Sequence, residues 1–169
     1  MGIAVSMPAE IGRRLLAHLG TRPTEQLAFM LCRWEGESAR VFDIRPIVAG
    51  GFDLQTPWHL SLSDDERAAV IRWAHQASAS LIEAHSHLLP GPAELSPSDL
   101  GGLDAFVPHV WWRLAHRPYA ALVFSEDSFD GLAWRVGPKS PEPIARLNLE
   151  GSAGWGSTGR TYRRLSQWK

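Results

Sequence analysis

The stretch Glu83-Ala84-His85-Ser86-His87, followed by Ser96-Pro97-Ser98-Asp99, decides how the rest of the chain is interpreted. The two histidines close a short apolar run, Ser80 to Ala84, which predicts a buried strand. Residues i and i+2 of a strand face the same side, so both imidazoles can point at one spot. Asp99 follows in the first turn of a predicted helix. Two imidazoles and one carboxylate form the ligand set of a hydrolytic zinc site, in which water takes the fourth position.

A purely structural interpretation of the same residues stays open. Ser96 suits a helix N-cap, Pro97 the first helical position and Asp99 the third. Helix capping alone would explain these residues without a metal, and a His-x-His pair by itself is a weak signal. The two interpretations are compatible, because Asp99 can bind a metal from a capped first turn.

These residues resemble the motif of the JAB/MPN (JAMM) zinc metalloprotease family, in which a remote glutamate is followed by His-x-His and then by Ser-x-x-Asp. Eight residues, Leu88 to Leu95, separate the two parts here, one more than is usual, and Leu88 replaces the usual proline. The resemblance implies that His85, His87 and Asp99 hold Zn²⁺. It also implies that Ser96 donates a hydrogen bond to the oxyanion of a tetrahedral intermediate.

Two glutamates compete for the role of general base. Glu25 stands after the first predicted helix and at the start of the first long apolar strand, where the resemblance places the catalytic glutamate. An exposed carboxylate at a strand edge is the structural alternative. Glu83 lies two residues before His85 and shares the predicted face of both histidines. Glu83 could therefore orient an imidazole or be the base itself, but we favour Glu25 as the base.

Composition bounds the class of protein. The chain has 169 residues, 44% hydrophobic and 21% charged, which is typical of one globular domain with a real core. Its net charge of -1 argues against general nucleic-acid binding, and no phosphate-binding glycine motif is present. A single cysteine, Cys32, allows no internal disulfide. No run of apolar residues is long enough for a membrane span and no signal peptide is recognisable, so we expect a cytoplasmic protein.

Helical and extended patterns alternate along the chain. We expect helices over residues 6–20, 63–78 and 97–107, the last ended by Pro108, and strands over residues 27–33, 39–48, 59–61, 81–84, 119–125 and 132–136. This alternation predicts an α/β or α+β class with a mixed sheet between helices. The family resemblance implies the same architecture, a JAB/MPN-like (cytidine deaminase-like) mixed β-sheet flanked by helices, over residues 1–136.

The remaining residues, 137–169, change character. They are rich in glycine, proline and basic side chains: from Arg135 onward there are 7 Lys and Arg against 2 Asp and Glu, whereas up to Trp134 there are 10 against 16. We therefore expect a basic C-terminal extension, mobile or docked, outside a metalloprotease domain formed by residues 1–136.

The resemblance implies a zinc-dependent (iso)peptidase acting after the C-terminus of ubiquitin or a ubiquitin-like protein. A short, arginine- and proline-rich chain is similar to the bacterial members encoded with activating-like and conjugating-like enzymes, some of them in anti-phage systems. A protease that processes sulfur-carrier proteins is a second possibility. A non-catalytic MPN scaffold is a third, although a scaffold would be expected to lack one or more of the ligands.

Overall fold

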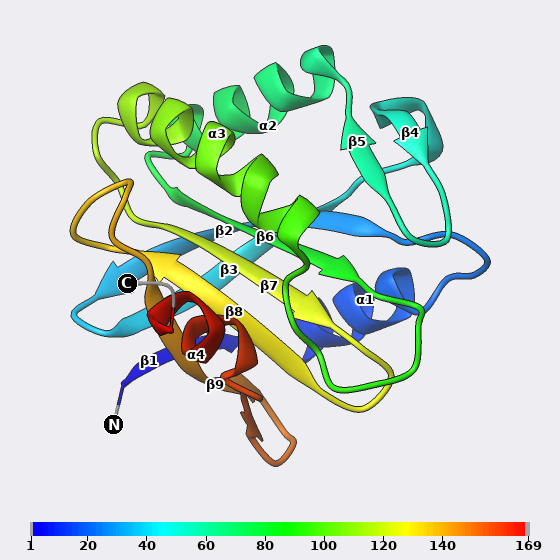
Figure 1. Cartoon of the computed structure of the whole chain (residues 1–169). Helices are drawn as coiled ribbons and strands as arrows, with labels where there is room; N and C mark the ends of the chain where they lie inside the picture. The colour runs from blue at the N-terminus through cyan, green and yellow to red at the C-terminus, as the bar shows by residue number, and fades with distance from the viewer. Residues whose placement is uncertain (1, 168–169) are drawn as a thin grey trace.

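A computed structural model describes residues 2–167 of the chain (Figure 1). The elements, in chain order, are β1 (Ile3–Met7), α1 (Ala9–Leu19), β2 (Leu27–Glu35), β3 (Ser38–Pro46), a 3-10 turn (Ala49–Gly51), β4 (Phe52–Gln55), β5 (Leu60–Leu62), α2 (Asp64–Gln76), β6 (Ser80–Ser86), α3 (Pro97–Arg113), β7 (Tyr119–Phe124), β8 (Phe129–Trp134), β9 (Glu142–Leu149), β10 (Trp155–Gly156) and α4 (Arg160–Ser166).

Seven of these strands close into a barrel. Their order is β1-β3-β2-β6-β7-β8-β9, and β9 pairs back with β1, while the short β10 is attached to β9 and β4 and β5 form a separate two-stranded sheet. The prediction of a JAB/MPN-like (cytidine deaminase-like) mixed sheet flanked by helices is therefore wrong, because these strands close into a barrel. The closure has a simple cause: β9, from residues expected to lie outside the core, joins β8 to β1, a strand that the sequence did not predict.

Side chains that alternate along the strands fill the inside of the barrel. On β2, for example, Ala28, Met30 and Cys32 point inward and are fully buried. We call this set, together with the inward residues of the other barrel strands, the inner cluster. Helix α1 adds Leu15 to it, with Ile11 and Leu19 on the same face. Each fully buried side chain of the size of valine, leucine or isoleucine contributes about 1.5–3 kcal/mol to the free energy of folding.

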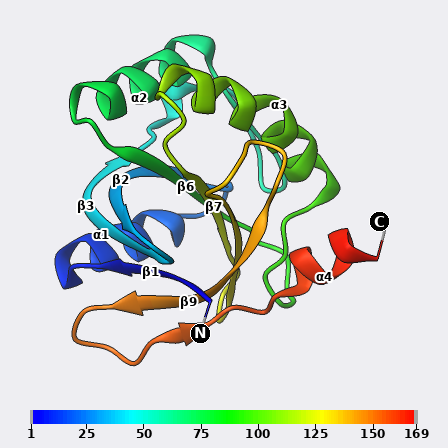
Figure 2. The ribbon, with the colours of Figure 1, turned by 90° about the vertical axis from the view of Figure 1, so that its left-hand side faces the viewer.

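The opposite face of β2, β6, β7 and β8 is covered by α2 and α3, which lie side by side over these strands (Figures 1 and 2). Outward residues such as Leu81 and Val123 form one buried cluster there with Val70 of α2 and Val107 of α3. This outer cluster matters for function, because β6 carries His85 between the barrel and α3. The sequence predicted α2 and β6 close to their observed bounds.

Helix α3 continues past Pro108 to Arg113, so the expectation that this proline ends the helix is wrong. Proline has no N–H to donate to the carbonyl of residue i−4, here Asp104. Lys139 donates from its Nζ to that carbonyl oxygen at 3.2 Å and also pairs with the Asp104 carboxylate. A lysine distant in sequence thus provides a partner for the carbonyl group that Pro108 cannot satisfy.

Residues 137–167 belong to the packed structure. Ile144 and Leu147 of β9 are completely buried in the inner cluster, and Thr161 at the start of α4 is also fully buried. The chain thus has no packing boundary at residue 136, where the extension was expected to begin. Within residues 2–167, no helix has the length and apolar character needed to cross a membrane.

Candidate metal centre

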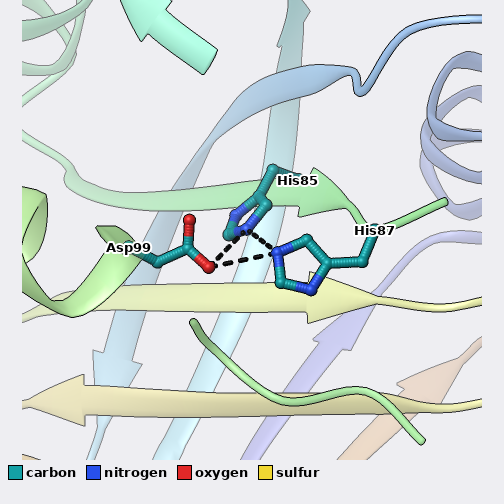
Figure 3. A group of neighbouring side chains, drawn as sticks. All are labelled: His85, His87 and Asp99. Atoms are coloured by element: carbon teal, nitrogen blue, oxygen red, sulfur yellow. Dashed lines mark hydrogen bonds and ion pairs between the residues drawn. The ribbon is translucent and has the colours of Figure 1, made fainter. Parts of the chain in front are cut away.

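His85, His87 and Asp99 come together at one end of β6, outside the barrel (Figure 3). His85 is the penultimate residue of β6, His87 lies just beyond the strand, and Asp99 is in the first turn of α3. The Nε2 atoms of the two histidines are 3.2 Å apart. Oδ2 of Asp99 lies 3.1 Å from Nε2 of His87 and 3.4 Å from Nε2 of His85. The three residues that the sequence proposed as ligands thus form one compact group.

The size of this group fits a metal ion. Ligand atoms about 2.0–2.2 Å from a metal in tetrahedral geometry lie about 3.3–3.6 Å from one another, and the three separations are within about 0.2 Å of that range. His85 is buried, whereas His87 and Asp99 are each half-buried. One side of the group therefore meets protein, and the other can be reached from outside. This donor set could hold a metal ion.

Helix capping orients the carboxylate. The Ser96 hydroxyl accepts a hydrogen bond from the Asp99 N–H at 3.1 Å, and Asp99 Oδ2 accepts one from the Ser96 N–H at 2.7 Å. The oxygen that completes this capping box is the same one that faces both histidines. The structural and the metal-binding interpretations of Ser96 to Asp99 therefore hold together, and the cap fixes the direction of the carboxylate.

The electrostatics of the group follow from its packing. Burial alone would raise the pKa of Asp99, but hydrogen bonds from His85 and His87 outweigh it and hold that pKa far below its usual range. Burial also opposes a charge on His85, yet the hydrogen bond and charge of Asp99 raise the pKa of His85 above its usual value. The Asp99 carboxylate and the His85 imidazole thus each favour the charged form of the other.

The chain at Glu25 runs beside the group, because the next residue, Gln26, is hydrogen-bonded to Ser86, which stands between the two histidines. Glu25 is only 5% exposed, and burial raises the pKa of its carboxyl, an effect opposed by the nearby charges of His85 and His87. Its backbone is held by the β4–β5 sheet, since its N–H donates to the carbonyl of Thr56 and its carbonyl accepts from Gln55, each at 2.9 Å. The structural alternative for Glu25, an exposed carboxylate at a strand edge, is therefore wrong.

Glu83 also faces this region but is already bonded. The Tyr119 hydroxyl donates to Oε2 of Glu83 at 2.6 Å. Burial raises the pKa of Glu83, which the hydrogen bond from Tyr119 partly opposes. For the Glu25 carboxylate, by contrast, no hydrogen bond is found among the described residues 2–167.

A cavity of about 350 Å³ opens beside the group, between β5, β6 and the start of α3. Glu83, His85 and Asp99 line it together with His59 and apolar side chains. His59 comes from the end of the β4–β5 turn, and its Nδ1 lies 3.5 Å from the Ser98 hydroxyl. Sequence reasoning did not select His59, and no motif or spacing in the chain would have done so. His109 lies in the C-terminal part of α3 and His116 just beyond its end, whereas Asp99 is in the first turn of that helix.

Comparison with known proteins identifies a fold but no activity. No protein-family model and no curated protein matches this chain. Among solved structures, it is similar to the solution structure of protein DSY2949 from Desulfitobacterium hafniense. The two are 17% identical with a TM-score of 0.57, over 88% of this chain and 94% of the other. An identity this low indicates a shared fold and carries no information about what either protein does.

Proposed function

We propose that this protein is a zinc-dependent peptidase that hydrolyses an amide bond at the group formed by His85, His87 and Asp99. One observation carries the proposal: three ligand atoms converge at metal-binding separations, and a buried glutamate, Glu25, lies beside them. Two imidazoles and one carboxylate are a donor set that zinc accepts in hydrolytic enzymes. Bound there, zinc would supply an activated water molecule and would polarise the carbonyl of the scissile bond.

Glu25 is assigned the role of general base. A general base must be able to take a proton near neutral pH. Burial favours the protonated, uncharged form of the Glu25 carboxyl and therefore raises its pKa above the usual value. The Glu25 carboxylate has no hydrogen bond among the described residues 2–167, so its oxygens are available to accept a proton, which supports this assignment. In this role Glu25 takes a proton from the attacking water and returns it to the departing amine.

Glu83 and Ser96 are assigned supporting roles. The hydrogen bond from Tyr119 fixes the Glu83 carboxylate and occupies one of its oxygens, which suits a group that shapes the cavity better than one that shuttles protons. The Ser96 hydroxyl uses its oxygen to cap α3 and keeps its own hydrogen free to donate. That hydrogen would bond the developing oxyanion, a contribution of about 10²–10³-fold to the rate.

The substrate class follows from the motif. The His-x-His and Ser-x-x-Asp pattern is similar to that of the JAMM peptidases, which supports a ubiquitin-like protein, its conjugates or its C-terminally extended precursor as substrate. Cognate activating-like and conjugating-like enzymes would be its partners. A metal-free scaffold is disfavoured, because all three ligands are present and converge.

The test is cleavage by zinc-loaded protein of three purified probes. They are ubiquitin extended by a linear peptide, ubiquitin joined to a lysine side chain, and a sulfur-carrier protein extended beyond its Gly-Gly terminus. We expect cleavage after the terminal glycine of at least one probe, and no cleavage by the His85→Ala variant. The probe that is cut decides between deconjugation and precursor processing. Zinc-loaded protein that cuts none of the three would contradict the proposed substrate class.

A further inference from the structure

The loop between His87 and α3 is held in place by the C-terminal segment. The N–H of Leu95, near the end of this loop, donates to the Thr161 hydroxyl at 3.0 Å. The Arg164 guanidinium donates to the Leu95 carbonyl, so both polar groups of the Leu95 backbone are bonded by side chains from α4. The Leu95 side chain is completely buried in the outer cluster. Figure 2 shows the segment that leads into α4 running beside this part of the chain.

The neighbouring loop residues are held by the same segment. The Thr158 hydroxyl donates to the Ala93 carbonyl at 2.7 Å. The Glu94 carboxylate pairs with Arg160 at 3.1 Å and with Arg164 at 2.6 Å. Three successive loop residues are thus bonded to residues more than sixty positions away in the sequence. By contrast, the middle of the loop, residues 89–92, is exposed.

A buried network anchors these contacts to the barrel. Asp130 of β8 is 1% exposed, and its Oδ2 accepts from the Thr161 N–H at 2.8 Å and from the Thr161 hydroxyl at 2.7 Å. Its Oδ1 accepts from the N–H of Gly131 and of Gly159. The Thr161 hydroxyl therefore donates to a fixed carboxylate and accepts from Leu95, which gives it one defined orientation.

The network continues to the metal centre. Leu95 precedes Ser96, and the Ser96 N–H donates at 2.7 Å to Oδ2 of Asp99, the atom that faces both histidines. The contacts run without interruption from the barrel wall through Thr161 and Leu95 to this oxygen. A displacement of Leu95 would move the Ser96 N–H and, with it, the carboxylate.

We infer that Thr161, anchored by Asp130, is a positioning residue for the metal ligand Asp99. The inference rests on the proposed metal centre and adds to it a role for the C-terminal segment. Residues that orient metal ligands from outside the ligand set typically affect metal affinity by about 10–100-fold. If the segment contributed stability alone, its loss would lower the unfolding temperature without changing the zinc affinity of the folded protein.

The test measures zinc Kd and unfolding temperature on the same samples of full-length protein. Thr161→Val keeps the shape of the side chain and removes its hydrogen bonds, and we expect it to weaken zinc binding about 10-fold or more. Thr161→Ser keeps the hydroxyl and should restore the wild-type Kd. Leu149→Ala, which removes a side chain of the inner cluster, is the control for lost stability: we expect a lower unfolding temperature with unchanged zinc Kd.

A second variant keeps the test decisive if Thr161→Val does not fold. Arg164→Met retains the apolar stem but removes the donor to Leu95, and it should also weaken zinc binding. If the folded Thr161→Val or Arg164→Met variant binds zinc with a Kd within twofold of wild type, the inference is overturned. An equal loss of zinc affinity in Leu149→Ala would also overturn it. Zinc binding without peptide cleavage would contradict the proposed peptidase alone, whereas wild-type protein that binds no zinc would overturn both proposals.

Discussion

The N–H of Gln26 donates a hydrogen bond to the side-chain oxygen of Ser86 at 2.9 Å, and the Ser86 N–H donates to the Gln26 carbonyl at 3.0 Å. Ser86 stands between the two histidines, and Gln26 follows Glu25. This double link ties the end of β6 to the start of β2 directly beside the metal centre. Together with the hydrogen bonds from Gln55 and Thr56, this link holds the backbone of Glu25 beside the two histidines.

Replacing Glu25 by glutamine should abolish catalysis and leave the metal in place. The substitution keeps the size of the side chain but removes the proton acceptor, so we expect amide cleavage to fall by about 10²-fold or more. Glu83→Gln is the matched control and should lower the rate less, because Glu83 is bonded to Tyr119. Cleavage rate and zinc content measured on the same samples provide the check. A nearly normal Glu25→Gln and an inactive, zinc-loaded Glu83→Gln would reverse the two assignments.

Removing a ligand should empty the metal centre. We expect about one zinc ion per wild-type chain and the loss of most of it in His85→Ala or Asp99→Ala, because two remaining ligands bind zinc weakly. Elemental analysis after dialysis measures this. His109→Ala, on the exposed surface of α3, is the control and should keep its zinc. Wild-type protein that stays metal-free after zinc addition would rule out the metal centre.

Zinc affinity should fall as the pH falls. Only the neutral imidazole binds zinc. Burial lowers the pKa of His85, but the hydrogen bond and charge of Asp99 outweigh this effect and raise that pKa above its usual value. Because a raised pKa keeps the proton on His85 to higher pH, the loss of affinity should begin above the ordinary histidine pKa of about 6.5. Asp99 stays ionised throughout, since its own pKa is lowered. Competition against a zinc chelator between about pH 6 and 8 measures the change, and a constant affinity would contradict it.

Truncation after Val136 should unfold the protein. It removes β9, whose Ile144, Leu147 and Leu149 pack in the inner cluster, each worth about 1.5–3 kcal/mol. That sum is comparable with the whole stability of a typical domain, about 5–15 kcal/mol. In the full chain, Leu147→Asp should have the same effect. Asn148→Asp adds the same charge at the exposed neighbouring position and should fold normally. Circular dichroism with thermal unfolding distinguishes these outcomes.

Cys32 should be unreactive in the folded protein. It is completely buried inside the barrel, and this burial raises the pKa of its thiol to about 12. The thiolate is the reactive form, so at pH 8 the native protein should not be alkylated by iodoacetamide, whereas the denatured protein should be fully alkylated. Mass spectrometry of the two samples measures this. Rapid labelling of native protein would contradict the burial of Cys32, and with it the packing of the barrel.

The grouping of His85, His87 and Asp99 could be predicted because each of them lies on, or directly after, a regular element with a local signal. The two-residue period of a strand brings His85 and His87 to one place, and a capping box determines where Asp99 points. His59 could not be predicted, because it enters through the two-stranded β4–β5 sheet. The placement of that sheet depends on backbone contacts with Glu25, which no sequence pattern records.

The closure of the barrel could not be predicted for similar reasons. In β1 the alternation of Ile3, Val5 and Met7 is short, and the sequence leads directly into α1. In β9 the register shifts, with Ile144 opposite Ile3 but Arg146 opposite the next residue. This irregularity separates the inward-facing Ile144 and Leu147 by three positions and breaks the two-residue period that identifies a strand. Elements with an unbroken pattern, such as α2 and β6, were predicted well.

The pairing of β1 with β9 also imposes an order of events on synthesis. Met7 lies opposite Leu149, so the ring cannot close until the ribosome has made every residue between them. Until that moment β1 and β8 each have one unpaired edge, the edge that will face β9. The backbone groups of these edges can pair with another nascent chain. Closure over so long a loop is intrinsically slow. Because β1 pairs with β9 only after nearly the whole chain has been made, we expect misassembly to occur mainly before β9 is synthesised.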